Sequence, residues 1–188
     1  MLILASASPR RVELLRAAGL EFEIVPAEVD EAALVTEEPW STAEATALAK
    51  ARRVLQAHPQ ATVIGGDTVV AVETEVGWTL LGKPQSDADA TRMLRLLNRR
   101  EHVVVTGVAV VTADRELVES ETSKVRIRMT EDEIAAYVAS GEPSGKAGAY
   151  AIQGGHAGIT LESGPWDNVV GLPMKLVHRL LTTSENDV

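Results

Sequence analysis

The sequence contains no cysteine and few aromatic residues, and both absences limit what the protein can be. Without cysteine it can hold no disulfide bond, no thiolate metal site and no cysteine nucleophile. We therefore expect it to work in a reducing compartment, the cytoplasm. Aromatic residues make up only 3% of the 188 residues, so the hydrophobic core has to be built from valine, leucine, isoleucine and alanine.

Long apolar runs and an excess of basic residues are missing as well. No apolar run approaches the roughly 18 residues that a membrane helix needs, and the short apolar start at 1–5 has no basic segment before it, as a secretory signal would. The formal net charge is −9, which opposes binding to a nucleic-acid backbone. We therefore expect neither a membrane nor a nucleic acid as a partner, and a phosphate ligand would need local cations, helix N-termini or a metal ion.

Extended and helical patterns alternate in the first half of the chain, and strands follow one another later, which predicts an α/β protein with a mixed sheet. The length fits one domain, 1–188, with 184–188 as a frayed tail. The predicted strands are 2–5, 20–26, 61–72, a hairpin at 74–84 that turns at Gly77, 102–113, 116–129 and 157–162. The predicted helices are 9–18, 41–58 with a capping box at Ser41, 86–100, 130–140 with a capping box at Thr130, and 173–182. We expect loops at 27–38, 141–155 and 163–171.

The stretch SASPRR at residues 6–11 breaks the usual charge order of a helix. Ser8 and Pro9 are typical of a helix start, so Arg10 and Arg11 fall in the first turn, where the helix dipole disfavours cations. A bound polyphosphate would make this arrangement complementary, because both the free N–H groups and the two guanidinium groups favour an anion. The alternative is that both arginines point into water and pair with a surface acid such as Glu13.

The stretch GGDT places an acid inside the most apolar predicted strand. Burying the Asp67 carboxylate is costly unless a cation, a hydrogen-bond donor or a metal ion is next to it. The glycines before it, Gly65 and Gly66, suggest a β-bulge or a close approach of the backbone to a ligand. The alternative, an aspartate that caps a turn at a strand end, is disfavoured by the apolar residues VVAV that follow.

Three lysines could face the same cleft as this aspartate. Lys83 ends the hairpin that begins with the strand of Asp67, so the two could lie together. Lys50 lies beside the apolar stripe of its helix, where a lysine often just extends into solvent. Lys146 belongs to GEPSGKAG, which has neither the spacing nor the strand-to-helix context of a P-loop, although a glycine loop could still approach a ligand. The four histidines show no metal-ligand spacing, so we expect surface or packing residues.

Together SASPRR, VDE, ALAKAR, GGDTVV, GKP, EPSGKAGAYAIQG and NVVGLP resemble, in order and spacing, the Maf family of nucleoside triphosphate pyrophosphatases. The resemblance runs from about residue 4 to residue 181. It implies a long twisted mixed sheet, two lobes with a nucleotide cleft between them, and a homodimer in many members. It also implies a divalent metal ion, Mg²⁺ or Mn²⁺.

By this resemblance, Asp67 is the catalytic proton acceptor, and Glu31 lies near the metal ion, which Asp67 could also hold. The family usually has alanine where this chain has Gly66. The residues expected to bind substrate are Ser8, Arg10, Arg11, Lys50, Thr68, Lys83, Lys146 and Gln153.

Three positions resemble the branch of the family that acts on dTTP and UTP, modified pyrimidine nucleotides included: Arg11 in an uninterrupted SPRR, Thr68 and Gln153. The branch that acts on 7-methyl-GTP has an aromatic residue before that arginine, glutamine after the aspartate and glutamate in the later loop. A glutamine amide both donates and accepts hydrogen bonds, which suits uracil or thymine. Two other functions stay open: a nucleotide-binding regulator of septum formation that does not hydrolyse its ligand, and a nucleotidyltransferase acting on a sugar phosphate.

Overall fold

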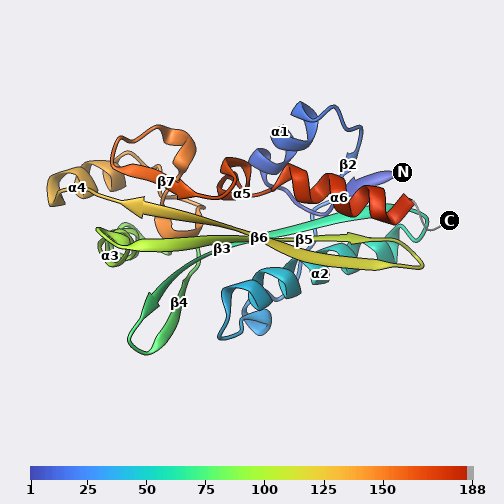
Figure 1. The fold of residues 1–188 in the computed structure, drawn as a ribbon, viewed down its shortest axis with the longest axis horizontal. Coiled ribbons are helices and arrows are strands. Elements are labelled where there is room, and N and C mark those ends of the chain that lie inside the picture. The colour runs from blue at the N-terminus through green and yellow to red at the C-terminus, as the bar shows by residue number, and fades with distance from the viewer. Residues whose placement is uncertain (186–188) are drawn as a thin grey trace.

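One mixed β-sheet runs through the whole molecule (Figure 1). A computed structural model describes the chain from residue 1 to residue 185. Its strands lie in the order β2-β1-β3-β5-β6-β7, and β4 pairs with the far part of β3. They are β1 (Leu2–Leu4), β2 (Glu23–Ile24), β3 (Thr62–Thr74), β4 (Gly77–Leu81), β5 (Glu101–Val111), β6 (Glu116–Ile127) and β7 (Ile159–Ser163). The expected α/β class with a long mixed sheet is confirmed.

The helices cover the two faces of this sheet differently. They are α1 (Pro9–Ala17), α2 (Pro39–Ala57), α3 (Asp87–Leu97), α4 (Glu131–Ala139), α5 (Trp166–Val170) and α6 (Met174–Glu185), with 3-10 turns at Ala32–Leu34, Ala147–Ala149 and Ile152–Gly154. Helix α2 packs on one face, whereas α1 and α6 cover one end of the other face and α3 and α4 its opposite end, with α5 between them (Figure 1). None of the described helices is long and apolar enough to cross a membrane.

Helix α2 lies unusually close to the sheet because two glycines face it. A Cβ atom on Gly65 would lie 2.1 Å from the carbonyl oxygen of Ala47, and one on Gly107 would lie 2.3 Å from that of Ala43. The pairing of β3 with β5 continues without a register shift through this region. The predicted β-bulge is therefore wrong, and the close approach at Gly65 is made by the backbone of α2.

Several local predictions hold and others need correction. The hairpin turn at Gly77 and the capping box at Thr130 are confirmed. Helix α2 begins at Pro39 and not at the predicted Ser41, since proline at the first helical position already has the helical φ angle. The segment 163–171 contains the helix α5 in place of the expected loop.

The bounds of two further elements differ from the prediction. Strand β2 is shorter than the predicted strand 20–26. Helix α6 runs to Glu185, so it overlaps the tail expected from residue 184, and residues 186–188 lie outside the described part of the chain.

His102 is a packing residue, and it makes the stability of the protein depend on pH. Its side chain is 1% exposed, and Nε2 lies 2.8 Å from the hydroxyl oxygen of Tyr150. Burial lowers the pKa of His102 to about 4. The unfolded chain, with a histidine pKa of about 6.5, therefore binds a proton between pH 6.5 and 4 that the folded chain does not. This contribution to stability is complete above about pH 6.5, and on the order of 3 kcal/mol is lost as the pH falls to 4.

We expect the free energy of unfolding in urea to fall less steeply between pH 7 and pH 5 for His102→Gln than for the parent protein. The exposed His178 offers the control, because His178→Gln removes a histidine that the fold does not bury. An unchanged pH slope in His102→Gln would contradict this assignment.

Candidate active site

A gap in the sheet opens into a large cavity. Strand β1 pairs with β3 as far as Ile64, and β4 pairs with β3 only from Val70 onward. Because β1 is parallel and β4 antiparallel to β3, the carboxyl ends of β1 and β4 meet at this gap. The segments SASPRR and GKP follow directly after these two ends. A cavity of about 780 Å³ opens there, at strand ends, where ligands usually bind in α/β proteins.

Every residue that the sequence suggested as a site residue lines this one cavity. They are Ser8, Arg10, Arg11, Glu31, Lys50, Asp67, Thr68, Lys83, Lys146 and Gln153. They come from both sides of the gap and from the later glycine-rich loop, so the fold brings together residues far apart in sequence. Their individual roles remain predictions.

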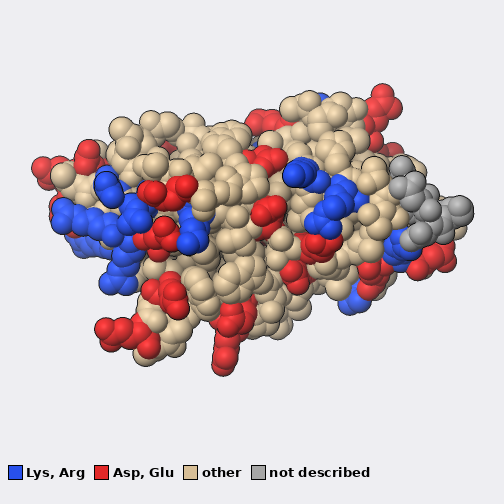
Figure 2. All heavy atoms as spheres, in the orientation of Figure 1, with Lys and Arg blue, Asp and Glu red and all other residues tan. Residues whose placement is uncertain are grey.

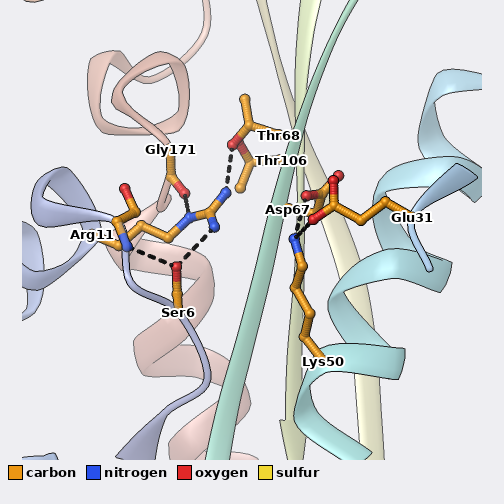
Figure 3. Close-up of polar contacts among 9 residues, drawn as sticks. Ser6, Arg11, Glu31, Lys50, Asp67, Thr68, Thr106 and Gly171 are labelled. Atoms are coloured by element: carbon orange, nitrogen blue, oxygen red, sulfur yellow. Dashed lines mark hydrogen bonds and ion pairs between the residues drawn. The ribbon is translucent and has the colours of Figure 1, made fainter. Parts of the chain in front are cut away.

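Arg11 is buried and held in place by three protein oxygens (Figure 3). Its Nε donates to the carbonyl oxygen of Gly171 at 2.8 Å, Nη1 to Oγ of Ser6 at 3.2 Å, and Nη2 to Oγ1 of Thr68 at 3.1 Å. A guanidinium has five N–H donors, so these bonds leave two for a ligand. Burial lowers the pKa of Arg11, and the charge of Asp67 opposes that shift. The alternative that Arg11 points into water is wrong.

The start of α1 also leaves donors for an anion. The half-buried Arg10 donates from Nε to the carbonyl oxygen of Val170 at 3.3 Å. Ser8 is the N-cap residue, but among the described residues its side chain makes no capping hydrogen bond. The first-turn N–H groups of α1 therefore remain available, and with Arg10 and Arg11 they form a surface suited to phosphate oxygens.

Lys50 joins two carboxylates on the other side of β3 (Figure 3). Its Nζ lies 2.7 Å from Oε1 of Glu31 and 2.9 Å from Oδ1 of Asp67. The alternative that Lys50 only extends into solvent is wrong, because its side chain is 10% exposed. Burial by itself would raise the pKa of Glu31, but the hydrogen bond from Lys50 and the charges of Lys50, Lys83 and Arg11 outweigh burial and lower it.

Neighbouring residues of β3 point to opposite faces of the sheet, and this divides the site in two. Thr68 contacts Arg11 on the face of α1, whereas Asp67 contacts Lys50 on the face of α2 (Figure 3). The same cavity reaches both groups around the open edge of β3. A ligand in the gap can therefore meet charged side chains from both faces.

The far wall of the cavity is formed by the end of β4 and the glycine-rich loop. The backbone N–H of Gly148 donates to the carbonyl oxygen of Gly82 at 3.1 Å, which holds the loop beside Lys83. Lys146 hydrogen-bonds to the carbonyl oxygen of Glu142. Gln153 lies in the turn at Ile152–Gly154 and is exposed, so its amide is free to face a ligand.

The two carboxylates fit a metal ion that arrives with its own further ligands. Among the described residues no group of three or more histidine, aspartate or glutamate side chains could hold a metal. Mg²⁺ commonly binds through one or two carboxylates, water and the phosphate oxygens of a substrate. Asp67 and Glu31 match this pattern, because Lys50 contacts only one oxygen of each carboxylate and leaves the second oxygen for a metal ion.

Some residues that shape the site were not assigned from the sequence. Ser6 and Gly171 accept hydrogen bonds from Arg11 and hold it in place. The hydroxyl oxygens of Thr106 and Thr68 lie 3.0 Å apart. Ser6 belongs to SASPRR and Gly171 to NVVGLP, so the motifs contained them. No local pattern shows which partner such residues find across the fold.

Comparisons with known proteins match nearly the whole chain. The model of a family described as "Maf-like protein" matches residues 1–184. A relative from Moorella thermoacetica named dTTP/UTP pyrophosphatase is 49% identical over 191 residues, covering 100% of this chain and 96% of the relative. Relatives of the same name from Symbiobacterium thermophilum and Koribacter versatilis are 48% and 45% identical, each covering 96% of this chain and 92% of the relative.

Proposed function

Because the chain belongs to the Maf-like protein family, we propose that it is a nucleoside triphosphate pyrophosphatase that acts on dTTP and UTP. The products would be the nucleoside monophosphate and pyrophosphate. The observation that carries the proposal is the meeting of Arg11 and Asp67 in one cavity at the gap of the sheet. The names of the relatives supply the choice of nucleotide.

The charge of the cavity supports a triphosphate as the ligand. Five cationic side chains and two carboxylates line it, although the whole chain has a net charge of −9. On the face seen in Figure 2, basic side chains gather at the left end with acidic side chains beside them, and the two kinds are interspersed toward the right. Exposed basic side chains also form ion pairs, such as that of Arg179 with Glu119 at 2.6 Å. An excess of positive charge gathered in a hollow is what a polyanionic ligand needs.

The reaction requires water to attack the α-phosphorus while pyrophosphate leaves. Phosphoryl transfer of this kind depends mainly on positioning and on neutralising negative charge. Arg10, Arg11, Lys83 and the start of α1 would bind the β- and γ-phosphates, because they present hydrogen-bond donors and positive charge to the cavity. Asp67 would orient the attacking water and take its proton, while Lys50 keeps this carboxylate in position.

The proposal includes a divalent metal ion, Mg²⁺ or Mn²⁺, held by Asp67 and Glu31. Such an ion neutralises phosphate charge and makes bound water a better nucleophile. We also propose that the protein works in the cytoplasm and forms a homodimer.

Pyrophosphate release from a panel of nucleoside triphosphates, with Mg²⁺, Mn²⁺ or a chelator present, tests the proposal. We expect the fastest turnover with dTTP and UTP and none with the chelator. Binding of nucleotides without turnover would indicate the regulatory function instead. Turnover only after a sugar phosphate is added would indicate a nucleotidyltransferase.

Replacing Gln153 by glutamate should change the choice of base more than the binding of phosphates. The carboxylate cannot donate to a carbonyl oxygen of uracil, and a mismatched polar contact costs about 1–3 kcal/mol, or roughly tenfold to a hundredfold. We expect kcat/KM for UTP to fall by this factor, while inhibition by tripolyphosphate, which has no base, changes only slightly. Gln85→Glu is the matched control, because Gln85 also lines the cavity but bonds to Lys83. An equal loss for every nucleotide would indicate a structural role for Gln153.

A further inference from the structure

The end of α5 contacts both arginines of the cavity. The carbonyl oxygen of Val170 accepts a hydrogen bond from Nε of Arg10, and that of Gly171 accepts one from Nε of Arg11. These neighbouring carbonyls lie where α5 ends, and carbonyls at a helix end have no partner within the helix. Two neighbouring arginines are thus oriented by two neighbouring carbonyls from the opposite end of the sequence.

Asn168 fastens α5 to the sheet. Its side chain is fully buried, and Nδ2 donates to the carbonyl oxygen of Val104 and to Oγ of Ser123, both at 2.9 Å. The hydroxyl of Ser123 in turn donates to the carbonyl oxygen of Pro165, at the start of α5, at 2.8 Å. The Oδ1 atom of Asn168 is buried without a partner among the described residues. The side chain is therefore used for its N–H donors.

A chain of hydroxyl groups links Arg11 to the same residue. Thr106 donates its hydroxyl proton to the carbonyl oxygen of Asn168 at 2.9 Å, so toward Thr68, 3.0 Å away, it can only accept. Thr68 therefore donates to Thr106 and accepts from Nη2 of Arg11. Two of the three protein contacts of Arg11 thus lead to the α5 segment.

We infer that Asn168 is a positioning residue that fixes α5, so that its carbonyls direct Arg10 and Arg11 toward the phosphates of the substrate. Asn168 does not line the cavity, so it acts only through the arginines. The inference rests on the proposed function, since it names what orients the phosphate-binding groups of that site.

The test uses Asn168→Leu, which keeps the approximate volume and removes both donors, and Thr106→Val, which breaks the hydroxyl chain with little change of shape. We expect KM for UTP and the dissociation constant of tripolyphosphate to rise about tenfold in each, with kcat changed far less. Tripolyphosphate binding is measured by calorimetry, so this readout remains if the parent protein hydrolyses no nucleotide and the proposed function fails. If Asn168→Leu does not fold, Thr106→Val decides alone.

Asn98→Leu is the matched control. The Asn98 amide also joins distant segments, since Nδ2 donates to the carbonyl oxygen of Met129 at 2.9 Å, but it lies outside the cavity. We expect it to lower the melting temperature without weakening tripolyphosphate binding.

If Asn168 and Thr106 act through Arg11, combining Asn168→Leu or Thr106→Val with Arg11→Lys should weaken tripolyphosphate binding little more than Arg11→Lys does alone. Unchanged tripolyphosphate binding in the folded variants, or full additivity with Arg11→Lys, would overturn the inference.

Discussion

Replacing Asp67 by asparagine is expected to lower kcat for UTP by about a hundredfold or more. Asparagine has the same shape, and its Oδ1 can still accept the hydrogen bond that Lys50 gives Asp67 at 2.9 Å. It can neither take a proton from water nor hold a divalent cation with a full negative charge. The loss should therefore appear in catalysis, with the melting temperature close to that of the parent.

Steady-state pyrophosphate release with UTP gives kcat, and a thermal melt of the same sample checks the fold. Glu73→Gln makes the same change of charge on the same strand at an exposed position outside the cavity. It should leave kcat unchanged. Turnover of Asp67→Asn within a fewfold of the parent would exclude both proposed roles of this carboxylate.

Replacing Arg11 by lysine is expected to lower kcat/KM for every nucleoside triphosphate by about a hundredfold. Lysine keeps the positive charge, but one ammonium group cannot reach Ser6, Thr68 and the carbonyl oxygen of Gly171 and also present two donors to a phosphate. The loss should not depend on the base, because this part of the cavity binds phosphates.

The comparison of UTP with dTTP and of both with tripolyphosphate inhibition checks this expectation. Arg16→Lys, at an exposed position in the last turn of the same helix, is the control. A base-dependent effect of Arg11→Lys, or an effect on the melting temperature alone, would show that Arg11 does not bind the phosphates.

Features that depend on neighbouring residues could be predicted from the sequence. The capping box at Thr130 is one example, because its hydroxyl accepts from the N–H of Glu133 only three residues later. The common cavity of Asp67 and Lys83 is another, since a tight hairpin returns the chain to the same place. Local geometry decides such features, so the sequence pattern reveals them.

Contacts between distant segments could not be predicted in this way. Arg11 finds an acceptor on Gly171, and Lys50 finds Glu31 on a segment without a regular pattern. Helix α5 is only five residues long, which is too short to show a helical periodicity of apolar residues in the sequence. It depends instead on the buried hydrogen bonds of Asn168. The residues alone indicated a phosphate-binding α/β protein, and the resemblance to a family supplied the substrate.

The interruption between β1 and β4 has a further consequence for how the protein avoids aggregation. An unpaired strand edge normally invites a second chain to extend the sheet. Here the free stretch of β3 between Ile64 and Val70 is short, and the ends of two strands of the same chain close it on both sides. An extended polypeptide has no room to align there, whereas a small molecule does. The arrangement that opens the sheet to a nucleotide therefore also excludes foreign strands.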